Sequence, residues 1–116
     1  MTSLLRLKKR RDFLCVYNAQ VSAASKTMIV QLYKRTDNSS ATRIGFTVSR
    51  KVGNAVQRNR ARRRLKAVVQ DVLPLFSIPG HDVVVVGRAS SVLSPYPLLV
   101  KDCQHALSHC LKKEKK

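Results

Sequence analysis

Residues 43–66 constrain the fold more than any other segment of the chain. Their pattern predicts a strand, a tight turn and a capped helix in direct succession. Asn54 is a good N-cap residue, and Gln57 follows it at the spacing of a capping box. Pro74 cannot continue a helix and sets its end near residue 73. Residues 42–50, just before the turn, alternate as in a half-buried strand. The apolar residues of this strand share one side: Ile44, Phe46 and Val48.

The predicted helix has one apolar side and one basic side. At helical spacing the apolar side consists of Ala61, Leu65, Val68, Val69 and Val72. The opposite side carries Arg60, Arg63 and Arg64, with Asn59 and Lys66 at its edges. No acid occurs between Asp37 and Asp71, so these cations have no partner of opposite charge on the helix. A solvated helix face usually mixes both signs, so this pattern instead favours a polyanionic partner.

The composition points in the same direction. The chain has 116 residues, the size of one ordinary domain, and a formal net charge of +17 from 23 basic and 6 acidic residues. Such an excess repels itself and is usually kept for an acidic partner, of which nucleic acid is the first candidate. An anionic membrane surface is the second, but the chain lacks Trp and its few aromatic residues are scattered.

The cysteines indicate a reducing compartment. Three are present, an odd number and too few for a disulfide scaffold, so we expect reduced thiols in a cytoplasmic protein. No secretory signal is visible, and no apolar run approaches the length of a membrane span.

The remaining pattern predicts one α+β domain over residues 1–116, with flexible ends at 1–8 and 113–116. A short helix at 13–18 precedes a connector or short strand at 21–26. The strand at 27–34 alternates, and an apolar run at 83–86 is typical of a strand covered on both faces. An amphipathic helix at 98–112 ends the domain. A helix between two strands suggests a split β-α-β unit in an α-β sandwich.

Two kinds of catalytic or metal site are disfavoured. The run from Cys103 to Cys110 contains two Cys and two His, but on a helix Cys103 and Cys110 share a side that His105 and His109 do not. We therefore expect core thiols and surface imidazoles. The six acids are dispersed, and no two form a motif for a two-metal nuclease site.

A family resemblance rests on the central segment. Residues 43–60, followed by Arg62 and Arg63, resemble the signature of the bacterial ribonuclease P protein subunit: RIGFTVSRKVGNAVQRNR. More loosely, Arg11, Asp12, Phe13 and Tyr17 resemble the first helix of that family, and the apolar strand before the last helix is also expected.

The resemblance implies an α-β sandwich like the second domain of ribosomal protein S5, with a left-handed β-α-β crossover. It also implies that a separate catalytic RNA with bound Mg²⁺ cleaves the 5′ leader from precursor tRNA. The protein would help to bind both RNAs and would carry no catalytic residue and no metal ligand. No membrane and no small-molecule substrate is expected.

The residues fall into two predicted surfaces. Those expected to contact the catalytic RNA are Arg50, Lys51, Asn54, Arg58, Asn59, Arg60, Arg62, Arg63, Arg64 and Lys66. Those expected to line a groove for the single-stranded leader are Phe13, Tyr17, Met28, Val30, Arg43 and Ser49. Phe13 and Tyr17 lie one helical turn apart and are either core residues or a stacking platform for bases.

The sequence departs from the family pattern at two positions and leaves two rival functions. Met28 and Gln31 stand where many members are expected to have aromatic residues, which puts their role in the leader groove in doubt. One rival is a ribosomal or translation-factor-like RNA-binding protein, which would sediment with ribosomal subunits. The other is a self-sufficient nuclease, which would cut RNA without an RNA partner.

Overall fold

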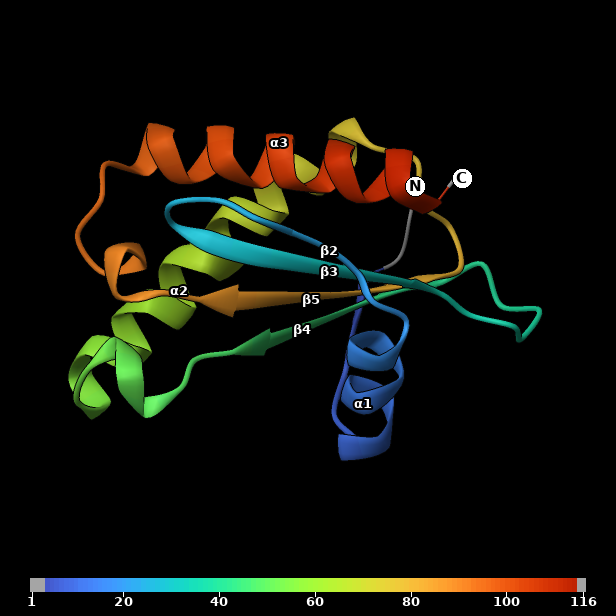
Figure 1. Cartoon of the computed structure of the whole chain (residues 1–116), viewed down its shortest axis with the longest axis horizontal. Helices are drawn as coiled ribbons and strands as arrows, with labels where there is room; N and C mark the ends of the chain where they lie inside the picture. The colour runs from blue at the N-terminus through green and yellow to red at the C-terminus, as the bar shows by residue number, and fades with distance from the viewer. Residues whose placement is uncertain (1–3, 115–116) are drawn as a thin grey trace.

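A computed structural model describes residues 4–114, which form a five-stranded mixed sheet with two helices on one face and one on the other (Figure 1). The strand order is β1-β4-β5-β3-β2. The strands are β1 (Leu4–Arg6), β2 (Val21–Ala24), β3 (Met28–Lys34), β4 (Thr42–Thr47) and β5 (His81–Gly87). The helices are α1 (Arg10–Asn18), α2 (Ala55–Val72) and α3 (Tyr96–Glu114), with short 3-10 turns η1 (Arg50–Val52), η2 (Leu73–Leu75) and η3 (Ala89–Ser91).

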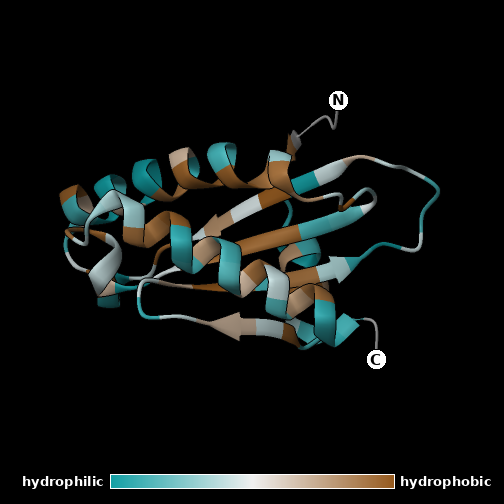
Figure 2. Cartoon of the chain, turned by 90° about the horizontal axis from the view of Figure 1, so that it is seen from above, coloured by the Kyte–Doolittle hydropathy of each residue, from teal (hydrophilic) through white to brown (hydrophobic). Residues whose placement is uncertain are grey.

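The main core lies between the sheet and the helices α2 and α3. The period of two along β3 puts Met28, Val30 and Leu32 on this face, and the period of 3.6 along α2 turns Leu65 and Val68 toward them. Seen from above, hydrophobic residues concentrate in the central strands and on the helix sides turned to them (Figure 2). The predicted strand and helix faces are therefore confirmed.

A second, smaller core lies on the opposite face, where α1 packs on the sheet. Leu7, Val16 and Val84 are buried there. The ring of Phe13 packs directly against Gly45. A Cβ added at residue 45 would lie 2.6 Å from Cε1 of Phe13, so only glycine leaves room for the ring. Because α1 covers only part of this face, the rest of it stays open beside the helix.

Three expectations about the architecture need correction. The N-terminal segment is not flexible up to residue 8, because Leu4–Arg6 pairs in parallel with β4 and Leu7 is buried. At the other end α3 continues to Glu114, whose carboxylate accepts a hydrogen bond from His81 Nε2 at 2.7 Å. The expected flexibility of residues 1–3 and 115–116 falls outside the described residues. Finally, β4 and β5 are direct parallel neighbours, so the β-α-β unit is not split.

A buried ion network ties α1 to the middle of the sheet. Asp82 in β5 is fully buried and accepts hydrogen bonds from Arg35 Nη1 at 2.8 Å and from Arg43 Nε at 2.7 Å. Arg43 also lies 3.5 Å from a carboxylate oxygen of Asp12 in α1. The hydrogen bond to Asp82, with the charges of the nearby carboxylates, raises the pKa of Arg43. The network therefore links α1 to β4 and β5 through Arg43.

Candidate RNA-binding surfaces

The start of α2 is built by local contacts that the sequence predicts. The Asn54 side chain accepts a hydrogen bond from the Gln57 backbone N–H, and the Gln57 side chain accepts one from the Asn54 N–H, both at 2.9 Å. Gly53 has a φ of +150°, which L side chains rarely adopt, and a Cβ there would collide with Gln57. The predicted capping box is confirmed, and the exposed residues Arg50 and Lys51 lie in η1, just before it in the chain.

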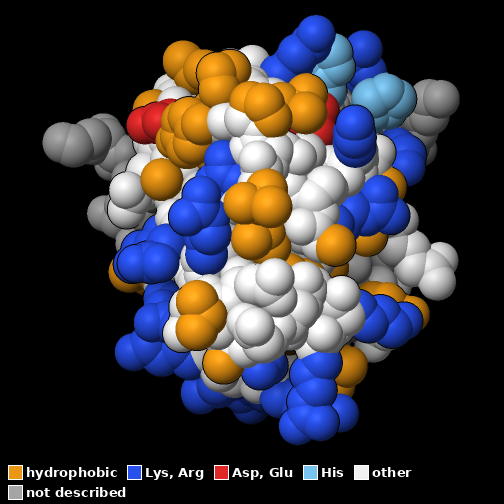
Figure 3. Space-filling model, turned by 90° about the vertical axis from the view of Figure 1, so that its left-hand side faces the viewer, with side chains coloured by type: hydrophobic (Ala, Val, Ile, Leu, Met, Phe, Trp, Pro, Cys, Tyr) orange, Lys and Arg blue, Asp and Glu red, His pale blue; other side chains and the backbone are white. Residues whose placement is uncertain are grey.

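One flank of α2, which we call the groove flank, carries four exposed polar side chains, three of them cationic: Asn59, Arg62, Arg63 and Lys66. Within residues 4–114, their side chains make one hydrogen bond, from Arg62 to Asn59 at 3.4 Å, and no salt bridge. Figure 3 shows the end of the molecule that carries the start of α2. Lys and Arg lie along both sides and the bottom of this view, whereas Asp or Glu occur only near its top. These side chains are free to meet phosphates.

Arg60 and Arg64 lie on the other flank of α2 and hold the segment after β5. Arg60 Nε donates to the Val92 carbonyl at 2.9 Å, and Arg64 Nη1 donates to the carbonyls of Ser91 and Val92 at 2.9 and 2.8 Å. Arg64 Nη2 also donates to the Ser94 carbonyl. No signal in the sequence predicts this structural role, because every residue carries a backbone carbonyl.

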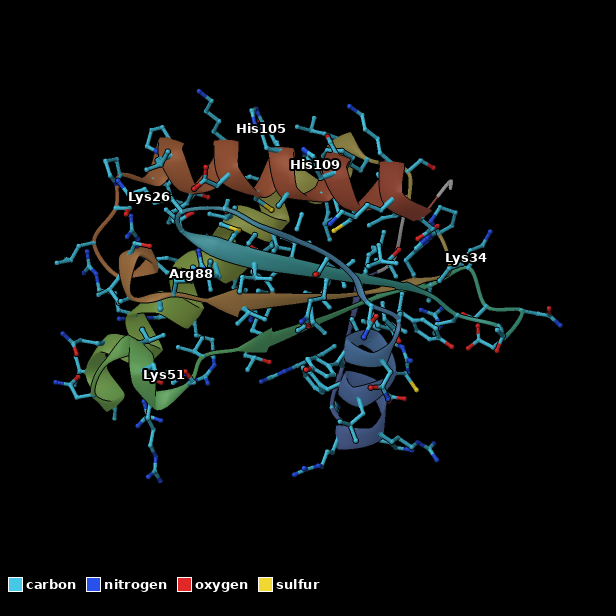
Figure 4. All side chains as sticks on the ribbon, in the orientation of Figure 1. Lys26, Lys34, Lys51, Arg88, His105 and His109 are labelled. Carbon is cyan, nitrogen blue, oxygen red and sulfur yellow. The ribbon has the colours of Figure 1, made fainter. Side chains whose placement is uncertain are left out.

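Arg58 differs from the other arginines of the helix. It precedes the core residue Leu65 by two turns and so lies on nearly the same side. Its side chain is half-buried, and its Nε is buried without a hydrogen-bond partner among the described residues. Arg58 therefore offers only its tip to a partner, whereas Lys51 projects away from the body (Figure 4).

The leader-groove prediction is wrong for Met28 and Val30. Their side chains are 0% and 1% exposed, because the alternation of β3 turns them toward the core under α3. The residues of β3 that face α1 and the open part of the sheet are Ile29, Gln31 and Tyr33, each half-buried. The departure at Gln31 therefore lies on the open face, whereas the one at Met28 lies in the core.

The other four predicted groove residues differ in their exposure and in their partners. Phe13 is half-buried on the sheet, whereas Tyr17 is 65% exposed, so only one of the two aromatic side chains of α1 belongs to the core. Ser49 is exposed between β4 and η1. The guanidinium of Arg43 is already bound by two carboxylates, so it has less to offer an RNA phosphate than its charge suggests.

The cysteines and histidines of α3 do not form a metal site. Cys103 and Cys110 are buried, and desolvation raises the pKa of their thiols to about 12 and about 11, which disfavours the thiolate that zinc requires. His105 and His109 are exposed on the helix (Figure 4). In the described part of the chain no three His, Cys, Asp or Glu residues are grouped to hold a metal ion, and no helix is long and apolar enough to cross a membrane.

Comparison with known proteins relates this chain to a single protein family. The family model described as Ribonuclease P matches residues 1–111. The ribonuclease P protein component of Paramagnetospirillum magneticum is 45% identical over 88% of this chain and 79% of its own length. The one from Caulobacter vibrioides is 41% identical over 88% of this chain and 68% of its own.

Solved structures agree in fold. The Staphylococcus aureus RNase P protein matches with a TM-score of 0.73 and 26% identity over 89% of this chain and 92% of its own. The RNase P protein from Thermotoga maritima matches with a TM-score of 0.71 and 25% identity over 86% and 92%. Together with the capped basic helix on a mixed sheet, these matches show that the chain belongs to the ribonuclease P protein family.

Proposed function

We propose that this chain binds the catalytic RNA of ribonuclease P through α2 and η1, and the 5′ leader of precursor tRNA through the open face of the sheet beside α1. The observation that carries the proposal is the groove flank, where Arg62, Arg63 and Lys66 are exposed and unpaired by acids within residues 4–114. Arginine suits this role because its planar guanidinium binds phosphate in two-pronged fashion and stacks on bases.

The acidic residues do not fit a protein-held Mg²⁺ site. Each of the six has a side-chain partner already: Asp12 and Asp82 with Arg43, Asp37 with Arg35, Asp71 with Tyr96, Asp102 with Thr27, and Glu114 with His81. A hard cation needs several carboxylate or carbonyl oxygens around one point, which these dispersed pairs do not provide. In the proposal Mg²⁺ is held by the RNA and the substrate.

The protein's part in the reaction is then electrostatic and positional. Cations of the groove flank neutralise phosphates where catalytic RNA and substrate approach each other, which lowers their mutual repulsion. The sheet face beside α1 holds the leader in one orientation, which favours the geometry for cleavage. The endonucleolytic step, hydrolysis of one phosphodiester at the mature tRNA 5′ end, takes place on the RNA subunit.

Reconstitution tests this division of roles. The chain mixed with the catalytic RNA of the same source should cleave precursor tRNA at moderate salt and low Mg²⁺, whereas the chain alone should not cleave. High salt should partly replace the protein, because salt provides the same screening. Cleavage by the chain alone would make it a self-sufficient nuclease. Sedimentation with ribosomal subunits and no effect on cleavage would favour the ribosomal alternative.

The leader contact is tested by changing Tyr17 to Ala. Because the Tyr17 side chain on α1 is 65% exposed, its loss should not unfold the protein. Stacking of a base on an aromatic ring contributes about 1–3 kcal/mol, so the affinity of the reconstituted complex for precursor tRNA should fall roughly 5- to 150-fold. Mature tRNA, which has no leader, should bind as before, and Tyr17→Phe should retain precursor binding. Equal losses for both tRNAs would show that Tyr17 is structural.

A further inference from the structure

A pocket of about 630 Å³ opens between the groove flank of α2 and the edge of the sheet formed by β1 and β4. Its volume lies within the roughly 300–1,000 Å³ typical of small-ligand sites. Ile44, Phe46 and Val69 line it from the core side. Leu5 and Val56 also line it, with exposed fractions of 51% and 75%. The pocket therefore offers an apolar surface that water covers in the free protein.

The remaining lining residues are polar or cationic. Arg62, Arg63 and Lys66 come from α2 and Arg6 from β1, and no Asp or Glu lines the pocket. Asn59 and Gln70, also on α2, add amide groups that can both donate and accept hydrogen bonds. An apolar pocket with amides and a ring of cations is complementary to a planar, hydrogen-bonding group that is linked to phosphates.

We propose that this pocket takes an unpaired nucleobase that protrudes from the catalytic RNA, with the adjoining phosphates on Arg62, Arg63 and Lys66. The inference rests on the proposed function and adds to it that one part of the α2 surface binds a base and not only the backbone. An acidic peptide would pair with the cations, but it carries no flat heterocycle that would both fill the apolar pocket and hydrogen-bond the two amides.

Affinity measurements separate base binding from phosphate binding. Leu5→Ser together with Val56→Ser makes the pocket wall polar without removing a charge, and both side chains are exposed enough for the fold to persist. We expect a roughly tenfold weaker affinity for the catalytic RNA, with an unchanged dependence on salt because the phosphate contacts remain. Leu75→Ser is the matched control, because Leu75 is 68% exposed and does not line the pocket. An affinity within twofold of wild type for the double variant would overturn the proposal.

Crosslinking gives an independent readout. A photoreactive group on Val56→Cys, in a Cys15→Ala background, should crosslink to one or a few unpaired nucleotides of the catalytic RNA, since Cys103 and Cys110 are buried from the reagent. The same group on Leu75→Cys should not reach them. Crosslinks confined to base-paired helices of the catalytic RNA would overturn the pocket inference. Failure of the wild-type chain to bind the RNA at all would instead overturn the proposed function.

Discussion

Replacement of Asp82 by Ala is expected to lower the free energy of unfolding by about 3–5 kcal/mol, because it leaves the buried guanidinium of Arg35 without its main counter-charge. The Arg35 side chain is 5% exposed, and Asp82 also accepts two hydrogen bonds from Arg43. A domain of this size is stable by only about 5–15 kcal/mol, so the thermal midpoint should fall by roughly 10–20 °C. Thermal unfolding followed by circular dichroism measures this.

The matched control is Asp37→Ala. Asp37 lies 3.2 Å from the same Arg35, but its side chain is 57% exposed, and an exposed ion pair contributes about 0–1 kcal/mol. Combining Asp82→Ala with Arg35→Met should recover part of the loss, because no uncompensated charge is then buried. If Asp82→Ala melted within a few degrees of Asp37→Ala, the buried network would not hold the fold together.

Changing Arg62, Arg63 and Lys66 together to Gln is expected to weaken binding of the catalytic RNA by about 10²-fold near 0.1 M salt. Each phosphate contact contributes roughly 0.7–0.9 to the slope of log K against log salt, so the slope should become less steep by about 2–3. The fold should persist, because all three side chains are exposed and Gln is a good helix former. Titration at several salt concentrations measures both quantities.

A second triple variant, Lys34, Lys101 and Lys112 to Gln, removes the same charge from exposed positions elsewhere. Lys34 lies at the far end of the molecule from the start of α2 (Figure 4). The effect of this second triple variant on RNA affinity, and on the slope of log K against log salt, should be small. Equal losses in the two variants would mean that the RNA responds to net charge alone and that the groove flank is no interface.

Local structure was largely predictable from the sequence. The capping box at Asn54 and Gln57 and the apolar spacing of α2 depend on residues within two turns of one another. The alternation of β3 likewise separates Met28 from Ile29 without reference to the rest of the chain. The edge strand β1 was missed because three residues carry little periodicity, and their pairing with β4 is a contact between distant segments.

The sequence predicts the positive charge of the RNA-binding surface, but it predicts only some of the residues that form this surface. The surplus of arginine without acids in residues 43–66 predicts a polyanion partner regardless of the fold. Two of those arginines, Arg60 and Arg64, turned out to hold backbone carbonyls of the segment after β5. Which cations stay free depends on which loop packs on each flank, and that loop is about 30 residues away in the chain.

The limits of α2, the two faces of α2 and β3, and the basic character of α2 were all predictable from the sequence, since they follow from hydrogen bonds and periodicity over a few residues. Which side of β3 lies under helices α2 and α3 depends on packing between distant segments. Met28 and Val30 share one side of β3 in either case, and the packing of α3 there made that side core. The tertiary structure also brought Leu5 and Val56, 51 positions apart in the chain, to the walls of one pocket. These features depend on long-range packing, because whether a side chain is buried is decided by the surface that packs against it as much as by the residue itself.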